Sequence, residues 1–368
     1  MKRILHVVGG MNRAGAETML MNLYRKIDRN KIQFDFVVFT NKKGDYDDEI
    51  IKLGGKLFVI KTSNPVLRTI ALKKFFKKNS QYKIIHCHTL LSNSLHLLAA
   101  KWANVPYRIA HSHNTGDNSR KKLTSFFYKK MAKILIKQLA TDFISCGKEA
   151  AKFLFDQNSN VMQLPNAIDF DKLAKIGGSE KTYLNKNFQI KERCLKIIQV
   201  GRLEAVKNPF YTINLAHELK KRQINFKLFF IGQGSLKENM EHDIKNKKLS
   251  DYVKLLGVRS DIPELMAGAD VLLMPSFHEG FPVVLVESQS VGLPALIADS
   301  ISKEVDLGAN LIKFESLNVD FSIWIEKLLA LKTKKYMNSS KRKKIIQEKG
   351  FDIRSNVKKI SNLYNSMV

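Results

Sequence analysis

The chain has 368 residues, of which 44% are hydrophobic and 26% charged, a composition typical of a globular protein long enough for two domains. Its three scattered cysteines argue against a disulfide framework or a zinc site, and no apolar run approaches the roughly 20 residues that span a bilayer. The formal charge of +28 favours negatively charged partners, such as nucleic acid, anionic lipid or phosphorylated ligands, without choosing among them.

The first half alternates short apolar runs with segments of helical periodicity. Strands are expected at residues 3–8, 34–40, 56–60, 83–88, 108–113 and 143–146, and helices at 18–27, 67–77, 92–103 and 148–155. This alternation is typical of a parallel, doubly wound α/β sheet.

The pattern pauses near residue 165, and the polar, aperiodic residues 175–191 predict a linker. Strands are then expected at 195–200, 227–231, 253–256, 271–274 and 295–297, and helices at 209–222, 236–247, 262–268, 283–291 and 351–367. We predict two doubly wound, Rossmann-like domains, residues 1–165 and 166–350, that face each other across a ligand cleft. The C-terminal helix at 351–368 is expected to pack back on the first domain.

Two loops in the second half carry residues suited to a diphosphate. Arg202 and Lys207 follow the strand expected at 195–200, and Pro209 opens the next helix, so two cations lie beside a helix N-terminus. Ordinary solvated loop charges would look the same. Gly232 and Gly234, in IGQG, would let the backbone approach a ligand, although so short a glycine motif is a weak signal.

Two glutamates eight positions apart flank an apolar run in SFHEGFPVVLVESQSVGLP, residues 276–294. Glu279 falls in the loop after the strand expected at 271–274, and Glu287 lies a turn inside the helix that begins near Val283. Such carboxylates can accept hydrogen bonds from ribose or hexose hydroxyls, and the nearby helix amides can meet phosphate oxygens. The structural alternatives are an ordinary loop acid and a buried cap or ion pair, and spacing alone does not decide.

The order of these motifs resembles that of the family-4 retaining glycosyltransferases of GT-B fold. GRL…KN, IGQG, HEGFPVVLVE and SVGLP follow the PNAID linker, while GGMNRAGAE, HCHTL and RIAHSHNT stand in the first half. The hallmark of the family is a glutamate, seven residues and a second glutamate, as Glu279 and Glu287 stand here. The resemblance covers nearly the whole chain and is closest in character to bacterial exopolysaccharide, capsule and lipopolysaccharide enzymes.

The resemblance implies a role for each matching position. Glu287 would bind the ribose of a nucleotide sugar, and Glu279 would hold the sugar near its 3- and 4-hydroxyls. Arg202 and Lys207 would neutralise the diphosphate, and His113 would face the transferred sugar. The other expected donor-binding residues are Gly15 near the diphosphate, Arg259 near the base, and Gly232, Gly280, Phe281, Val283 and Val284.

His113 has competitors in the first half. It ends the strand expected at 108–113, but His111, His86 and His88 form HxH pairs with similar surroundings. A histidine at a strand end is also often purely structural. We favour His113 because it comes last before the following loop. No carboxylate or cysteine accompanies either HxH pair at ligand spacing, so no metal site is predicted.

The expected chemistry is metal-independent. No DxD-like pair stands where a metal could bridge the phosphates, so cations and helix amides would stabilise the leaving diphosphate. No cofactor is expected beside the nucleotide sugar, and the resemblance favours UDP as its carrier. It also implies that the acceptor attacks from the face that the diphosphate leaves, and that the acceptor is a saccharide, often lipid-linked.

Residues 119–137, SRKKLTSFFYKKMAKILIK, carry seven cations and no acid. This pattern is typical of a helix on a membrane surface, and equally of an ordinary helix with a solvated basic face. Because residues 1–165 hold 29 lysines and arginines against 11 acids, we expect a cytoplasmic protein, peripheral at the inner face of the membrane. A nucleic-acid binder is disfavoured because no binding module is recognisable, and another GT-B enzyme such as a nucleotide-sugar epimerase is the alternative.

Overall fold

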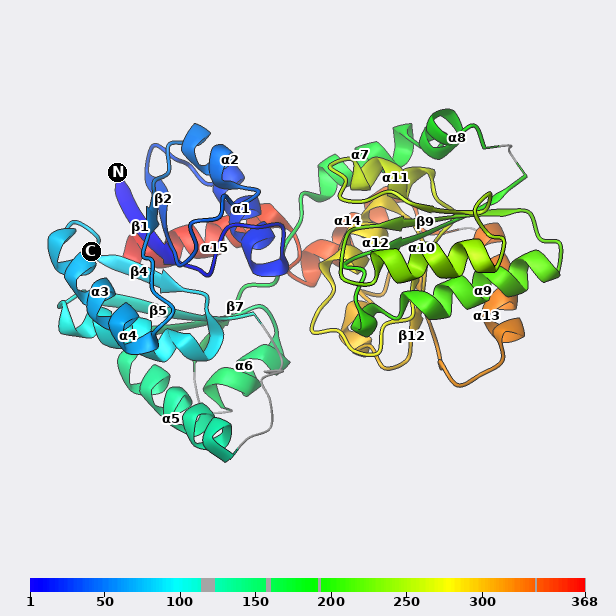
Figure 1. Cartoon of the computed structure of the whole chain (residues 1–368). Helices are drawn as coiled ribbons and strands as arrows, with labels where there is room; N and C mark the ends of the chain where they lie inside the picture. Colours follow the sequence, from blue (N-terminus) through cyan, green and yellow to red (C-terminus); the bar gives the residue numbers. More distant parts are fainter. Residues whose placement is uncertain (114–122, 157–159, 191–192, 335, 368) are drawn as a thin grey trace. The chain divides into compact units, whose positions relative to one another are not determined.

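The computed structural model describes residues 1–113, 123–156, 160–190, 193–334 and 336–367, and the chain divides into two compact units (Figure 1). The first unit holds Met1–Ile168 together with Gly350–Val368, and the second holds Asp169–Lys349. The sequence had placed the boundary at residue 165 and the return of the chain at residue 351. Each unit contains one parallel sheet, as the alternating pattern predicted.

The sheet of the first unit has seven strands in the order β3-β2-β1-β4-β5-β6-β7. They are β1 (Lys2–Val7), β2 (Ile32–Val38), β3 (Leu57–Val59), β4 (Ile84–Cys87), β5 (Tyr107–Ser112), β6 (Asp142–Ser145) and β7 (Val161–Gln163). Alternate residues supply the two faces, so Ile4 joins one core cluster and Leu5 the other. The order reverses between β1 and β4, whose carboxyl ends therefore mark a topological switch point.

Helices cover both faces of this sheet. On the face of Ile4 lie α1 (Gly15–Lys26), α2 (Asp47–Lys52) and α15 (Ile353–Ser366); on the other face lie α3 (Pro65–Lys78), α4 (Asn93–Trp102), α5 (Leu123–Leu139) and α6 (Lys148–Phe155). α15, red beside the blue β1 in Figure 1, is held by the Lys2 ammonium. This cation donates to the carbonyls of Tyr364, Asn365 and Met367 at the helix C-terminus, where positive charge is favourable.

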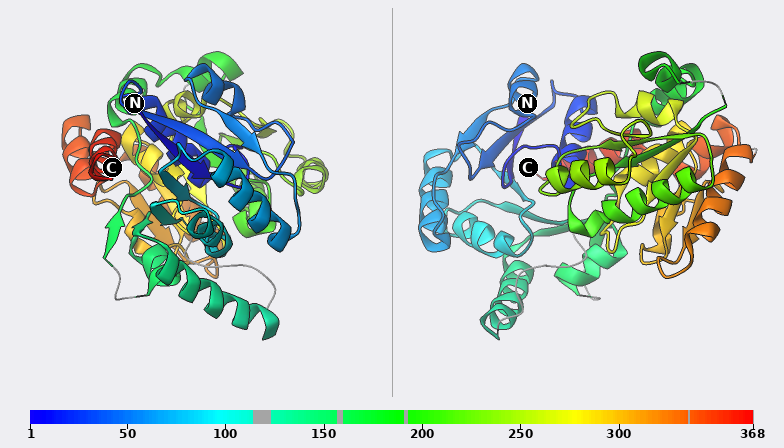
Figure 2. Two further views of the ribbon diagram at one scale, coloured as in Figure 1. Left: turned by 90° about the vertical axis from the view of Figure 1, so that its left-hand side faces the viewer. Right: turned by 45° about the vertical axis from the view of Figure 1, so that its right-hand side comes forward.

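The sheet of the second unit has six strands in the order β10-β9-β8-β11-β12-β13, and its switch point lies between β8 and β11. The strands are β8 (Leu195–Val200), β9 (Phe226–Ile231), β10 (Val253–Leu255), β11 (Val271–Met274), β12 (Ala295–Ala298) and β13 (Ile312–Glu315). One face is covered by α9 (Pro209–Lys221), α10 (Lys237–Asn246) and α13 (Phe321–Thr333), of which the green α9 and α10 can be followed in Figure 2. Five more helices pack together in this unit: α7 (Phe170–Ser179), α8 (Tyr183–Phe188), α11 (Ile262–Gly268), α12 (Val283–Val291) and α14 (Ser339–Glu348).

The prediction of an aperiodic linker at 175–191 is wrong over most of its length, because this stretch contains the end of α7 and all of α8. The glycine content of this stretch had suggested a linker, but Gly177 has a packing role. A Cβ at this position would lie 2.1 Å from the carbonyl oxygen of Val291, so the glycine allows α7 to pack closely on α12. Lys191, the last residue of the predicted linker, lies outside the described residues.

Candidate functional site

Two loops meet at the switch point of the second sheet. The loop after β8 passes through Gly201 into a 3-10 turn at Ala205–Lys207, and the loop after β11 leads from Pro275 to α12. The amide of Phe277 donates to the carbonyl of Val206 at 2.9 Å and so joins the two loops. Because carboxyl ends of neighbouring parallel strands lie at one edge, residues far apart in sequence come together here.

Lys207 and Glu279 form an ion pair at this edge. The Lys207 Nζ lies 2.6 Å from Oε1 and 2.7 Å from Oε2 of Glu279, and the two side chains are only 18% and 10% exposed. Gln199 fixes the turn by donating from Nε2 to the Lys207 carbonyl at 2.9 Å. Two residues selected from the sequence are therefore in contact. In this arrangement, a ligand phosphate could replace Glu279 as the ion-pair partner of Lys207.

Gly232 and Gly234 support the β8 loop from the side of β9. A Cβ on Gly232, whose φ is +140°, would lie 2.0 Å from the Gly201 carbonyl oxygen, and one on Gly234 would lie 2.3 Å from that of Leu203. Both positions thus require glycine for close contact between protein backbones. This packing role is separate from the ligand contact that the sequence suggested for Gly232.

Glu287 lies in the second turn of α12 and is half-buried. Among the described residues its carboxylate has no hydrogen bond and no ion pair. Burial without a compensating partner raises the pKa of Glu287 to about 7. A carboxyl group in this condition gains from any ligand hydroxyl that donates to it.

The N-terminus of α12 lies between the two glutamates. Pro282 precedes it in an extended conformation, no side chain caps it, and its first turn holds no acidic residue. Its first amides belong to Val283 and Val284, and Gly280 and Phe281 lie just before Pro282. The first amides of a helix have no intrahelical acceptor, so this end of α12 suits an anion.

The two arginines selected from the sequence occupy different settings. Arg202 is exposed, and within the described part of the chain its guanidinium makes no hydrogen bond. Arg259 follows the edge strand β10 and binds Asp261 through two contacts of 2.8 and 2.7 Å. Tyr183 also donates to Asp261, and these hydrogen bonds, led by that of Arg259, lower the pKa of this carboxyl to about 2. Arg259 is therefore held in place by Asp261 without a ligand.

Gly15 is the exposed first residue of α1 in the first unit. A Cβ at this position would meet nothing within 4 Å, so protein packing gives no reason for a glycine here. Ala14 precedes it without a side-chain cap, which leaves the first amides of α1 available to a ligand.

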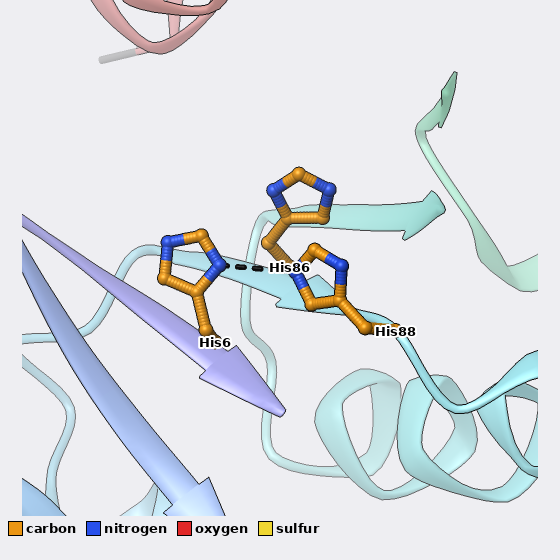
Figure 3. A group of neighbouring side chains, drawn as sticks. All are labelled: His6, His86 and His88. Atoms are coloured by element: carbon orange, nitrogen blue, oxygen red, sulfur yellow. Dashed lines mark hydrogen bonds between the residues drawn. The ribbon is translucent and has the colours of Figure 1, made fainter. Parts of the chain in front are cut away.

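His113 belongs to a group of histidines at the switch point of the first sheet. This histidine cluster consists of His6, His86, His88, His111 and His113, of which Figure 3 shows the first three. His6 and His86 are neighbours in the β1–β4 register, on the face of the sheet that α15 covers. The hydroxyl of Tyr364 on α15 lies 2.7 Å from His86 Nδ1.

Ring nitrogens within the histidine cluster contact one another. His6 Nδ1 lies 3.0 Å from His88 Nε2, His88 Nδ1 lies 2.9 Å from His113 Nε2, and His86 Nε2 lies 3.2 Å from His111 Nδ1. Burial lowers the pKa of all five imidazoles, that of His113 to about 3, so the cluster is neutral at physiological pH. The sequence reasoning missed His6 and Tyr364. The sequence did contain a sign of the cluster. A histidine stands near the carboxyl end of each of three neighbouring strands, at positions that point to the same face of the sheet.

α5 covers the described part of the predicted basic helix, because residues 119–122 lie outside the described residues. Ala132 and Ile136 are buried, whereas Phe126, Phe127 and Met131 are 66%, 63% and 55% exposed. No described helix combines the length and the apolar content that crossing a bilayer requires.

Comparison with known proteins adds independent findings. Residues 13–172 match the family model described as Glycosyltransferase Family 4, and residues 181–309 match Glycosyl transferases group 1. The chain is 38% identical to EpsF of Bacillus subtilis (strain 168), a protein named as a glycosyltransferase, over 99% of this chain and 96% of that one. It is 28% identical to the UDP-Gal:alpha-D-GlcNAc-diphosphoundecaprenol alpha-1,3-galactosyltransferase of Escherichia coli, over 91% and 90% of the two chains. The crystal structure of Anabaena HepE in complex with UDP-glucose matches all of both chains with a TM-score of 0.78 at 17% identity, which confirms the predicted GT-B fold.

Proposed function

The chain belongs to the family 4 glycosyltransferases, and we propose that it transfers a hexose or N-acetylhexosamine from a nucleotide sugar to a saccharide in bacterial surface-polysaccharide biosynthesis. UDP is the proposed carrier, because the Escherichia coli relative is by name a UDP-Gal enzyme and HepE holds UDP-glucose. The observation that carries the proposal is the pair of glutamates flanking the uncapped N-terminus of α12. One is ion-paired with Lys207, and the other has no partner among the described residues.

We assign the donor contacts as follows. The ribose hydroxyls donate to Glu287, and this relieves the burial of its carboxylate. The sugar hydroxyls donate to Glu279. The diphosphate replaces Glu279 as the ion-pair partner of Lys207 and also binds Arg202. The remaining proposed contacts are the amides of Gly280, Phe281, Val283 and Val284 to phosphate, Gly15 and Gly232 beside the diphosphate, Arg259 at the base, and His113 at the sugar.

The proposed reaction retains the anomeric configuration. The bond between the anomeric carbon and the diphosphate oxygen breaks, and the acceptor oxygen bonds to that carbon on the same face. The acceptor proton passes to an oxygen of the leaving diphosphate. Lys207, Arg202 and the α12 amides would stabilise the charge that develops on this group, so we propose that transfer needs neither a metal nor a cofactor.

Nucleotide binding tests the proposal directly. Thermal shift and calorimetric titration with UDP, GDP, ADP and UDP-sugars, each with and without EDTA, should show binding of a uridine nucleotide that EDTA does not change. The Glu287→Gln variant should bind at least about tenfold more weakly, since the amide loses the negative charge and one of the two oxygens that accept from the ribose hydroxyls. The matched control is Glu241→Gln, at an exposed carboxylate of α10 in the same unit. Absence of nucleotide binding, together with salt-sensitive binding to DNA or RNA, would overturn the proposal.

We further propose a lipid-linked acceptor and binding of α5 to the inner face of the cytoplasmic membrane. The Escherichia coli relative is named for a diphosphoundecaprenol-linked acceptor. An ordinary surface helix would bury its large apolar side chains, but α5 leaves Phe126, Phe127 and Met131 exposed, and the same helix carries the exposed Lys130 and Lys137. Apolar side chains flanked by cations suit the headgroup region of an anionic bilayer.

Co-sedimentation with vesicles tests the membrane proposal. The protein should bind vesicles that contain phosphatidylglycerol more strongly than pure phosphatidylcholine, and replacing both Phe126 and Phe127 by serine should weaken binding at least about tenfold. Ile51→Ser is the control, because Ile51 is 62% exposed on α2 of the same unit. Equal losses in the control and in the double variant would contradict a specific role of α5.

A further inference from the structure

The histidine cluster brings ring nitrogens from three strands into one small volume. Two groups of three have ring nitrogens that all lie within 4.8 Å of one another: His6, His86 and His88, and His88, His111 and His113. The first group is drawn in Figure 3. These residues come from β1, β4 and β5 and from the positions just after β4 and β5, so rigid strand ends hold them together.

Hydrogen bonding inside the cluster necessarily leaves a lone pair unused. His6, His88 and His113 form a chain joined by two N–H···N bonds. Three neutral imidazoles carry three protons, and two of these protons lie in the two bonds. The third proton can occupy only one end of the chain, His6 Nε2 or His113 Nδ1, so the other end keeps a bare lone pair. Both end atoms are buried and have no partner in the described structure.

His111 adds another buried ring nitrogen without a hydrogen-bond partner among the described residues. His111 Nε2 is also buried without a partner, whereas its Nδ1 is bonded to His86. Buried polar atoms in folded proteins are nearly always satisfied, and exceptions call for an explanation such as a bound ion. His111 and His113 lie 4.0 Å apart between ring centroids, so their unsatisfied nitrogens belong to one neighbourhood.

We propose that His88, His111 and His113 bind a divalent transition-metal ion, with Zn²⁺ as the first candidate. Neutral imidazole is a preferred ligand of zinc, and three protein ligands leave a fourth position for water. Ligand nitrogens on a tetrahedral zinc lie about 3.3 Å apart. The candidate ligand nitrogens of the three histidines lie within 4.8 Å of one another, so the rings would have to approach by at most about 1.5 Å.

This group of three is a better site than His6, His86 and His88. His111 and His113 each have a nitrogen without a partner, so only His88 must exchange a hydrogen bond for the metal. In the other group both His86 and His88 would have to do so. His88 and His113 are also only half-buried, which gives an ion a route to the site. The site shares His113 with the proposed sugar contact, but the argument for it does not rest on the proposed transfer, which needs no metal.

Metal titration of the chelator-stripped full chain tests the proposal. Zn²⁺ titrated against a chromophoric chelator should bind at about one ion per chain, and Co²⁺ should give the visible absorption of a tetrahedral site. His88→Gln and His113→Gln should each lower the affinity at least about tenfold. His96→Gln is the control, because His96 is a buried histidine of α4 outside the cluster, hydrogen-bonded to Thr89. Circular dichroism of the stripped variants would establish that each of them folds.

X-ray absorption at the zinc edge of the unaltered protein provides a measurement that needs no variant. Three imidazole ligands and one oxygen are expected. Absence of stoichiometric binding, an imidazole count of one or none, or affinity unchanged in both cluster variants would overturn the proposal. UDP titrations on the same preparations report separately on the second unit, so failure of the metal site is distinguishable from failure of the proposed transferase activity.

Discussion

Replacing Glu287 by glutamine should stabilise the second unit while weakening nucleotide binding. Burial raises the pKa of Glu287 from 4.5 to about 7, so between these pH values the native protein holds a proton that the unfolded chain has released. The stability associated with this proton is complete below pH 4.5 and is lost as the pH rises through 7. The difference between these two pKa values, at 1.36 kcal/mol per pH unit, corresponds to at most about 3 kcal/mol. Glutamine keeps the shape of the side chain and cannot ionise.

The two tryptophans make this prediction measurable in the second unit alone. Trp324 is fully buried in its core, and Trp102 lies in the first unit, so in a Trp102→Phe background the fluorescence reports on the second unit. In urea denaturation, the stability advantage of glutamine over glutamate should grow by about 2 kcal/mol between pH 5 and pH 8. An advantage that is equal at both pH values, or a glutamine variant less stable at pH 8, would refute the view of Glu287 as an unpaired buried carboxyl.

Two further predictions concern the same unit. Gly232→Ala should cost about 2 to 4 kcal/mol of stability, because its Cβ would overlap the Gly201 carbonyl at a φ of +140°. Gly257→Ala, at φ +66° in open space, should cost only about 1 kcal/mol, and equal costs in denaturation experiments would contradict this reasoning. A double-mutant cycle of Lys207→Met and Glu279→Gln should give a coupling of about 1 to 3 kcal/mol without ligand. The coupling energy should become smaller when a UDP-sugar is bound. A coupling energy that the UDP-sugar leaves unchanged would show that the ion pair stays intact and would contradict the proposed exchange of partners.

The sequence predicted many of the periodic elements but missed others, including the long helices α13 and α14 and the strand β13. The helix expected at 148–155 has these bounds in α6, and the alternation of strands and helices correctly indicated two parallel sheets. The short elements β7 and α2, of three and six residues, were also missed, and segments of this length carry little periodic signal. Gly177 misled in a different way, since close packing of α7 on α12 and a flexible linker both use glycine.

The predicted site depended on topology more than on local pattern. The contact between Lys207 and Glu279 spans 72 positions, and only the rule that switch-point loops converge makes it foreseeable. The bond between Arg259 and Asp261 could not be foreseen, because each side chain has several acceptors or donors within reach in sequence. The sequence drew attention to four of the five histidines in the cluster, but not to His6, which lies far from the two HxH pairs and becomes their neighbour only through the order of the strands.

The return of the chain to the first unit has a consequence for its synthesis. The second unit is one continuous segment, whereas the first lacks α15 until residues 353–366 have been made. Ile360 and Tyr364 of that helix are buried in the core of the first unit, and Tyr364 contacts His86. A growing chain emerges from the ribosome in sequence order, so the unit begun first is finished last. While the second unit is being translated, the part of the first core that α15 completes stays exposed beside α1 and α2, and we expect the nascent chain to be more prone to aggregation during this interval.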